Sequence, residues 1–148
     1  MVSIKVKKQA NPVSVFKLPW PPTVNLYYRV TGKGLRIAQG GLLYRDAVAA
    51  AMHAAPPHNY GTARLNVQIA TCLPDRQRRD LDNLLKPLLD AIEKTGLLYV
   101  NDSQIDNLHI IRGPIVGRAE ACLVIRVSVF KETLFNKIMR FVGKYHSL

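Results

Sequence analysis

The chain has 148 residues, and its 21 lysines and arginines outnumber its 10 aspartates and glutamates, which gives a formal net charge of +11 and a pI near 10.0. A chain of this length can bury a core without disulfides or a structural metal, and its apolar fraction of 48% excludes overall disorder. No apolar run approaches the roughly 18 residues that a membrane span needs, and the N-terminus lacks the apolar block of a secretory signal. We therefore expect a single cytoplasmic domain over residues 1–148 that has no membrane partner.

The positive charge bears on the partners of the chain. It favours polyanions, chiefly nucleic acid, with acidic membrane surfaces second, and the alternative is a solvated face of lysines and arginines. Cys72 and Cys122 each lie inside an apolar run, so we interpret them as buried apolar residues of a reducing compartment, with a disulfide as the alternative. The four histidines are scattered, which argues against a zinc site.

The first third of the chain predicts short strands and one helix. Residues 13–18 alternate as a strand does, and the prolines after Leu18 end it. We expect residues 23–29 to be irregular or briefly extended, and a glycine turn to precede a short strand over 35–38. Helical spacing then predicts an amphipathic helix over residues 40–55, with apolar positions at Leu42, Leu43, Ala47, Ala50, Ala51 and Ala54.

The middle of the chain predicts a strand, a charged loop and a second helix. Residues 63–73 alternate, so one face of the strand is apolar: Leu65, Val67, Ile69, Thr71 and Leu73. A charged loop follows over residues 74–80. A helix begins near Asn83, with its first turn distorted by Pro87, and Gly96 lies just past its end. Its apolar stripe consists of Leu84, Leu85, Leu88, Leu89 and Ile92.

The last third predicts two strands, over residues 105–112 and 119–130, and a terminal helix over 131–142. This mixture of strands and helices is typical of an α+β fold. We expect a two-layer sandwich, in which a mixed β-sheet carries helices mainly on one face. Residues 131–148 form a C-terminal extension to this domain.

Acidic residues gather in one stretch of this basic chain. Asp80, Asp82 and Asp90 follow three arginines, and Asp102 comes soon after. If the chain is extended at Asp80 and Asp82, both side chains leave the same side of the backbone and can share a cation. Hard ions such as Mg²⁺ bind one or two carboxylates together with waters and phosphate oxygens. Carboxylates amid arginines therefore predict a metal-dependent phosphodiesterase.

Each of these charges also has a structural interpretation. Asp80 or Asp82 can cap the N-terminus of the helix, where negative charge is favoured. Lys86 can form a surface ion pair with Asp82 or Asp90, which lie one turn away on either side. We expect Asp90 to pair with Lys86 or Lys94 and not to bind metal.

Three blocks of the sequence resemble the RusA family of Holliday junction resolvases. They are LPWPPTVNLYYR, from Leu18 to Arg29, RQRRDLDNLLKPLLDAIEKTGLL, from Arg76 to Leu98, and VNDSQIDNLHIIR, from Val100 to Arg112. The blocks occur in the order that the family shows, and the middle block is the most specific. The chain after about Phe130 is not covered by these motifs.

The resemblance implies a homodimeric, Mg²⁺-dependent endodeoxyribonuclease that resolves four-way DNA junctions by paired symmetric nicks. Mn²⁺ could replace the ion, and no small-molecule cofactor is implied. The essential residues of the family fall on Asp80, Asp82, Lys86 and Asp102, of which the three aspartates would bind the metal. Family members often have two acids before the Ser103-Gln104 pair, whereas here the first is Asn101.

In this interpretation Lys86 neutralises charge on the scissile phosphate. Further side chains are candidates for DNA contact: Arg76, Arg78 and Arg79 on the phosphates, and Asn25, Tyr27, Tyr28 and Arg29 along the DNA surface, where tyrosines can stack on bases. A core or dimer-interface role for the tyrosines is equally open, and Trp20 is interpreted as a packing anchor.

Two alternatives remain open, namely a nuclease of broader branched-DNA specificity and a non-catalytic basic module that binds DNA or RNA. Carboxylates repel phosphates unless a cation lies between them, which argues against the second. Two symmetric cuts need two active sites, so a two-fold dimer is expected. The apolar stripe of the second helix and the terminal helix are its candidate surfaces.

Overall fold

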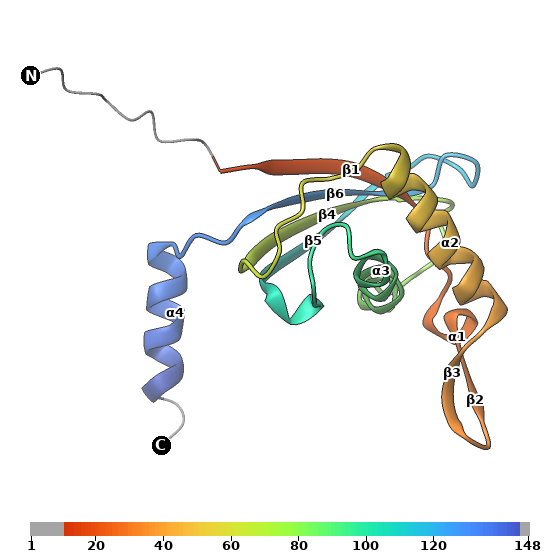
Figure 1. Ribbon diagram of the computed structural model, residues 1–148, viewed down its shortest axis with the longest axis horizontal. Helices are drawn as coiled ribbons and strands as arrows, with labels where there is room; N and C mark the ends of the chain where they lie inside the picture. Colours follow the sequence, from red (N-terminus) through yellow and green to blue (C-terminus); the bar gives the residue numbers. More distant parts are fainter. Residues whose placement is uncertain (1–10, 146–148) are drawn as a thin grey trace, which may run out of the picture.

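The structure is a computed structural model that describes residues 11–145. Its central element is a four-stranded sheet in the order β1-β6-β4-β5 (Figure 1). The strands are β1 (Val13–Pro19), β4 (Leu65–Leu73), β5 (Ile105–Ile115) and β6 (Cys122–Val129). Only β4 and β5 are parallel among these neighbours, so the sheet is mixed.

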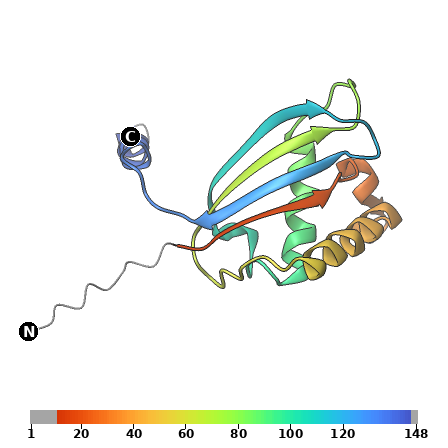
Figure 2. The same cartoon turned by 90° about the horizontal axis from the view of Figure 1, so that it is seen from above.

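Two helices cover one face of this sheet, as Figure 2 shows from above. They are α2 (Gln39–Ala54) and α3 (Asp82–Thr95). The core lies between the two layers, where Leu65, Val67 and Ile69 of β4 meet Leu88 and Ile92 of α3. The predicted α+β two-layer architecture is therefore confirmed, and no helix within the described residues is long and apolar enough to span a membrane.

The alternation of β4 predicts its inner face correctly. Leu65, Val67, Ile69, Thr71 and Leu73 are all buried. In α3, by contrast, the predicted stripe is only partly right, because Leu84, Leu88 and Ile92 are buried while Leu85 and Leu89 are half-buried. Pro87 sits within a continuous helix, and Gly96 ends it with a φ of 64°. Because its buried leucines belong to the core of its own chain, they cannot form a dimer surface.

Two sequence predictions in the first third of the chain are wrong. The segment over residues 23–29, expected to be irregular or briefly extended, contains a short helix, α1 (Val24–Tyr27), and is extended only where the strand β2 (Tyr28–Thr31) begins. In α2 the buried side chains are Tyr44, Val48 and Met52, and Leu42 and Leu43 face solvent. An alanine-rich helix has little contrast between its faces, so its sequence did not reveal that the larger side chains at every fourth position face the sheet.

A small hairpin extends below the main sheet. It consists of β2 and β3 (Gly34–Ile37), which pair antiparallel (Figure 1). The N-terminal end of α2 lies directly against the base of this hairpin. A Cβ on Gly41 would lie 2.5 Å from the carbonyl oxygen of Tyr27, so only glycine allows this approach.

The two cysteines were expected to be buried but are half-buried. They lie opposite each other on neighbouring strands, because Cys72 of β4 pairs in register with Cys122 of β6, and both are free thiols. The terminal helix α4 (Leu134–Tyr145) begins three residues later than predicted. Its apolar side chains are exposed, so it remains a candidate dimer surface.

Candidate active site

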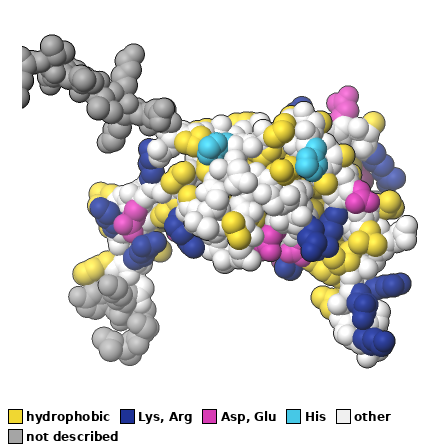
Figure 3. All heavy atoms as spheres, in the orientation of Figure 1, with side chains coloured by type: hydrophobic (Ala, Val, Ile, Leu, Met, Phe, Trp, Pro, Cys, Tyr) yellow, Lys and Arg dark blue, Asp and Glu magenta, His cyan; other side chains and the backbone are white. Residues whose placement is uncertain are grey.

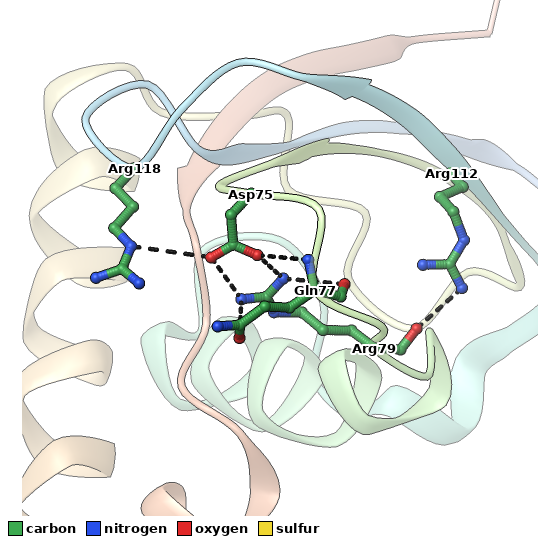
Figure 4. A network of polar contacts seen from close by, with 5 residues as sticks. All are labelled: Asp75, Gln77, Arg79, Arg112 and Arg118. Carbon is green, nitrogen blue, oxygen red and sulfur yellow. Dashed lines mark hydrogen bonds and ion pairs between the residues drawn. The ribbon is translucent and has the colours of Figure 1, made fainter.

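The charged loop between β4 and α3 is organised around the carboxylate of Asp75 (Figure 4). This carboxylate accepts hydrogen bonds from Arg79 at 2.5 and 3.0 Å and from the backbone amide of Gln77 at 2.9 Å. The Arg79 guanidinium, and then the Gln77 amide, lower the pKa of Asp75 to about 2. Asp75 therefore remains ionised at neutral pH and holds the loop in shape.

Arg79 has a structural role in this loop. The guanidinium carbon of Arg79 lies 6.0 Å from the centre of the Trp20 ring. The backbone carbonyl oxygen of Arg79 accepts a hydrogen bond from the Arg112 side chain at 2.9 Å. Trp20 is a packing anchor, as predicted. Arg76 and Arg78, by contrast, are exposed and form no ion pair in the part of the chain that the structure describes. These two are therefore free to bind phosphates.

A hollow of about 400 Å³ lies beside this loop. It is lined by Leu73, Asp75, Arg76, Gln77, Arg78, Arg79, Asp80, Arg112 and Ile115. Four of these residues are arginines, one of them Arg112 from β5, and Asp80 is the one candidate catalytic carboxylate among them. The charge of the hollow suits a phosphate group.

Asp80 and Asp82 flank the start of α3 but do not leave the same side of the backbone as they would in a strand. Leu81 between them has helical angles, with φ −66° and ψ −32°, so the extended conformation expected there is not formed. No side chain caps the helix, so the capping interpretation is not supported for either aspartate. Within the described chain, neither carboxylate takes part in a hydrogen bond or ion pair.

Lys86 lies one turn into α3 and binds Asp90 instead of Asp82. Its Nζ lies 2.7 Å from Oδ1 of Asp90, and Oδ2 of the same carboxylate accepts a hydrogen bond from the hydroxyl of Tyr28. Burial, and then the nearby charges of Asp102 and Glu93, raise the pKa of Asp90 to about 6. The predicted pairing of Asp90 with Lys86 is confirmed.

Asp102 lies in a short 3₁₀ turn, η1 (Asp102–Gln104), that precedes β5. Its backbone amide donates to Glu93 of α3 at 2.9 Å. Gln104 holds the turn from within: Oε1 accepts from the amides of Val100 and Asn101, and Nε2 donates to two carbonyls of the loop before β4. Asn101 caps the turn through its side chain, a role that suits asparagine at this position.

The three candidate metal ligands are not assembled in one described chain. Among residues 11–145, no three His, Cys, Asp or Glu side chains lie close enough to hold a metal ion. Asp102 contacts Glu93, which lies eleven residues along α3 from Asp82, or about 16 Å at the helical rise. Even so, all three carboxylates lack a cationic partner within the described chain, whereas Asp75, Asp90 and Asp106 each have one.

The structure separates the candidate DNA contacts of the N-terminal block. Tyr27 is fully buried, and its hydroxyl accepts a hydrogen bond from Arg45 at 2.7 Å, so it cannot stack on a base and its expected DNA contact is wrong. Tyr28 is half-buried against Tyr27 and Asp90. Asn25 and Arg29 are exposed. The core role left open for these tyrosines therefore applies to Tyr27.

Three residues that shape the site were not predicted from the sequence, namely Asp75, Gln104 and Arg112. Asp75 stands four residues before Arg79, a spacing that could have suggested their ion pair. Gln104 belongs to the Ser-Gln motif, but the motif gave no indication that its side chain holds the turn. Nothing in the sequence indicated that Arg112, at the far end of β5, reaches the loop.

An α+β domain with exposed carboxylates among arginines has the features of a nuclease. Comparison with known proteins identifies which one: the family model of endodeoxyribonuclease RusA matches residues 19–128. The chain belongs to this family of endodeoxyribonucleases. The helix α4 lies outside the matched region.

Individual relatives agree with this assignment. The crossover junction endodeoxyribonuclease of Enterobacteria phage HK97 is 37% identical over 98 residues, which cover 66% of this chain and 81% of the relative. The enzymes of that name from Escherichia coli K12 and Enterobacteria phage 82 are each 36% identical over 105 residues, which cover 70% of this chain and 87% of the relative.

Proposed function

We propose that this chain cuts four-way DNA junctions by paired nicks in recombination and repair, with a divalent metal ion, Mg²⁺ or Mn²⁺, as its cofactor. The observation that carries the proposal is the state of Asp80, Asp82 and Asp102 in a basic chain: none has a cationic partner among the described residues, although arginines surround the first two. The names of the relatives supply the substrate.

The donor set fits the ion. Three carboxylates without protein partners offer the oxygen ligands that Mg²⁺ prefers, and the arginine-lined hollow beside Asp80 suits the phosphate that would share it. When bound, the ion would activate water for attack on a phosphodiester. Because the substrate is DNA, we place the enzyme in the cytoplasm.

The side chains of the loop and of α3 have separate tasks in this proposal. Arg76 and Arg78 hold the DNA backbone, while Arg79 keeps the loop in shape by binding Asp75. Lys86 neutralises charge on the scissile phosphate, and Asp90 holds its ammonium at 2.7 Å beside the helix until DNA arrives.

A homodimer follows from the two cuts, and it also offers a source for the missing ligand. Asp80 and Asp82 lie at one end of α3 and Asp102 lies near the other, so one chain alone does not bring them together. Asp102 from a second copy can complete the set if the two chains pair near α3. The exposed apolar side chains of α4 are a candidate for part of the dimer contact.

Incubation with a synthetic mobile four-way junction, with Mg²⁺ and with a chelator, tests the activity. We expect symmetric nicks in opposite strands in Mg²⁺ alone. Equal cutting of flaps and forks would indicate a broader branched-DNA nuclease. Binding without any metal-dependent product would indicate a non-catalytic module.

Mixing two inactive variants tests where the third ligand comes from. In a dimer made of one variant alone, Asp82→Asn or Asp102→Asn removes a metal ligand from both active sites. If a site takes ligands from both chains, mixed dimers regain one intact site, so we expect cleavage to return on mixing. No recovery, with mixed dimers shown to form, would place all three ligands in one chain.

A further inference from the structure

The β2–β3 hairpin has two chemically different faces. Cross-strand neighbours share a face in an antiparallel pair, and here Arg29 lies opposite Arg36 while Val30 lies opposite Leu35. One face is therefore cationic and the other apolar. Lys33 adds a further positive charge at the tip.

The cationic face has no counter-charge within the described chain. Arg29, Lys33 and Arg36 take part in no ion pair there, and all three are exposed. Like charges directly across a strand pair destabilise it. In Figure 3 dark blue side chains gather over this projecting hairpin at the lower right. An arrangement that costs stability in the free protein and leaves cations unpaired suits a polyanion.

The apolar face continues from the core to the tip. Tyr28 and Ile37, at the base of the hairpin, pack against the core. Val30 and Leu35, one pair further out, are 85% and 66% exposed. Proteins that kink DNA frequently insert apolar side chains of this kind between neighbouring bases.

The hairpin is tied to the candidate active site at its base. The hydroxyl of Tyr28, the first residue of β2, donates to the same Asp90 carboxylate that binds Lys86 at 2.7 Å. The strands continue for three residues beyond Tyr28, about 10 Å at the rise of a strand. The base of the hairpin is therefore tied to the carboxylate that binds Lys86, and the tip lies about 10 Å beyond Tyr28.

We propose that this hairpin recognises the branch point of DNA: Val30 and Leu35 contact base faces that open at the branch, and Arg29 and Arg36 bind the flanking phosphates. Stacked bases inside a duplex offer no such faces, so the apolar pair distinguishes branched from linear DNA while the arginines hold both. This inference rests on the proposed function and names the element that selects the substrate.

Two double variants separate the two faces in the full chain. Binding to a labelled four-way junction and to a linear duplex is measured by anisotropy over a range of salt concentrations, without Mg²⁺ so that nothing is cut. We expect V30T/L35T to lower the preference for the junction about tenfold or more, with duplex affinity and salt dependence unchanged. We expect R29Q/R36Q to weaken both complexes and to reduce the salt slope by about 1.8 for each chain of the dimer that contacts DNA.

The controls are matched in kind and number. V15T/I111T changes two exposed apolar strand residues on the face of the sheet away from the helices, and K17Q/R126Q removes two charges from strands. Neither should alter the preference for the junction. V30F/L35F enlarges the apolar tip and should keep or increase that preference, whereas V30T/L35T lowers it.

An unchanged junction preference in V30T/L35T would overturn the inference. The inference would also be overturned if the wild-type chain is a dimer and V30T/L35T is a monomer. That result would mean that the tip contacts a second copy of the chain. Both results can be distinguished from failure of the proposed function, in which the wild-type chain itself would show no Mg²⁺-dependent cleavage of the junction.

Discussion

Lys86 and Asp90 form an ion pair one turn apart on α3, with Nζ 2.7 Å from Oδ1. The same carboxylate accepts a hydrogen bond from the hydroxyl of Tyr28. Lys86 is exposed while Asp90 is mostly shielded from solvent. The carboxylate is therefore the fixed member of the pair, and the ammonium can leave it for a phosphate.

Lys86→Ala should lower the turnover of junction cleavage by roughly 10²–10³-fold, as loss of one group that stabilises transition-state charge does, with a much smaller loss of binding. Single-turnover cleavage and separate binding measurements check this. Lys94→Ala is the matched control, since Lys94 is exposed on the same helix without an ion pair in the described chain. A Lys86→Ala enzyme with wild-type turnover would reduce Lys86 to a surface ion pair.

Asp90 should make the stability of the fold depend on pH. Its pKa is raised to about 6 from an ordinary 3.8, chiefly by burial, so the folded chain holds the proton more tightly than the unfolded chain. Stability from this group is full below about pH 4 and is lost as pH rises through about 6. Relative to Asp90→Asn, the wild-type free energy of unfolding should therefore fall between about pH 4 and 7.5 in urea titrations. A relative rise would mean that Lys86 and Tyr28 outweigh burial.

Asp75→Asn should disturb the loop that carries Asp80. The change removes the charge that binds Arg79, so the guanidinium is released from the position that it holds in Figure 4. We expect cleavage to fall roughly tenfold or more, because small displacements of reacting groups are costly. Asp46→Asn, an equal change at an exposed aspartate of α2, should cut at the wild-type rate. Equal rates for the two variants would contradict this role.

Gln104→Ala should destabilise the fold. Gln104 is buried and makes four hydrogen bonds to backbone groups, which the variant leaves without partners. We expect a loss of about 2–4 kcal/mol in the free energy of unfolding, measured in urea. Gln39→Ala, at an exposed position at the start of α2, should change it by less than about 0.5 kcal/mol. A similarly small loss at Gln104 would mean that solvent replaces its bonds.

Much of the fold could be predicted from local pattern. The inner face of β4 and the end of α3 at Gly96 follow from alternation and from a left-handed glycine, which are local properties. The buried face of α2 was predicted wrongly, because alanines on all sides weaken the contrast between its faces, although Tyr44, Val48 and Met52 recur at every fourth position. Tyr27 and Tyr28 are adjacent and of one type, yet only tertiary packing decides that the first is buried.

The candidate site divides in the same way. The motifs name Asp80, Asp82, Lys86 and Asp102, and spacing along a helix predicts the Lys86–Asp90 pair. Spacing did not predict how Asp80 and Asp82 are oriented. The predicted orientation assumed that Leu81 is extended, whereas its backbone angles are helical. Spacing could not predict the contact of Asp102 with Glu93 either, which forms between segments that meet only after folding.

We expect the carboxylates at the start of α3 to serve cleavage and not the fold. The most direct measurement of this is the rate at which Asp82→Asn nicks a four-way junction in Mg²⁺, together with its junction affinity and thermal stability. We predict a loss of cleavage of about 10³-fold or more, with affinity and stability close to those of the wild-type chain. Nicking at the wild-type rate by this variant would contradict the account.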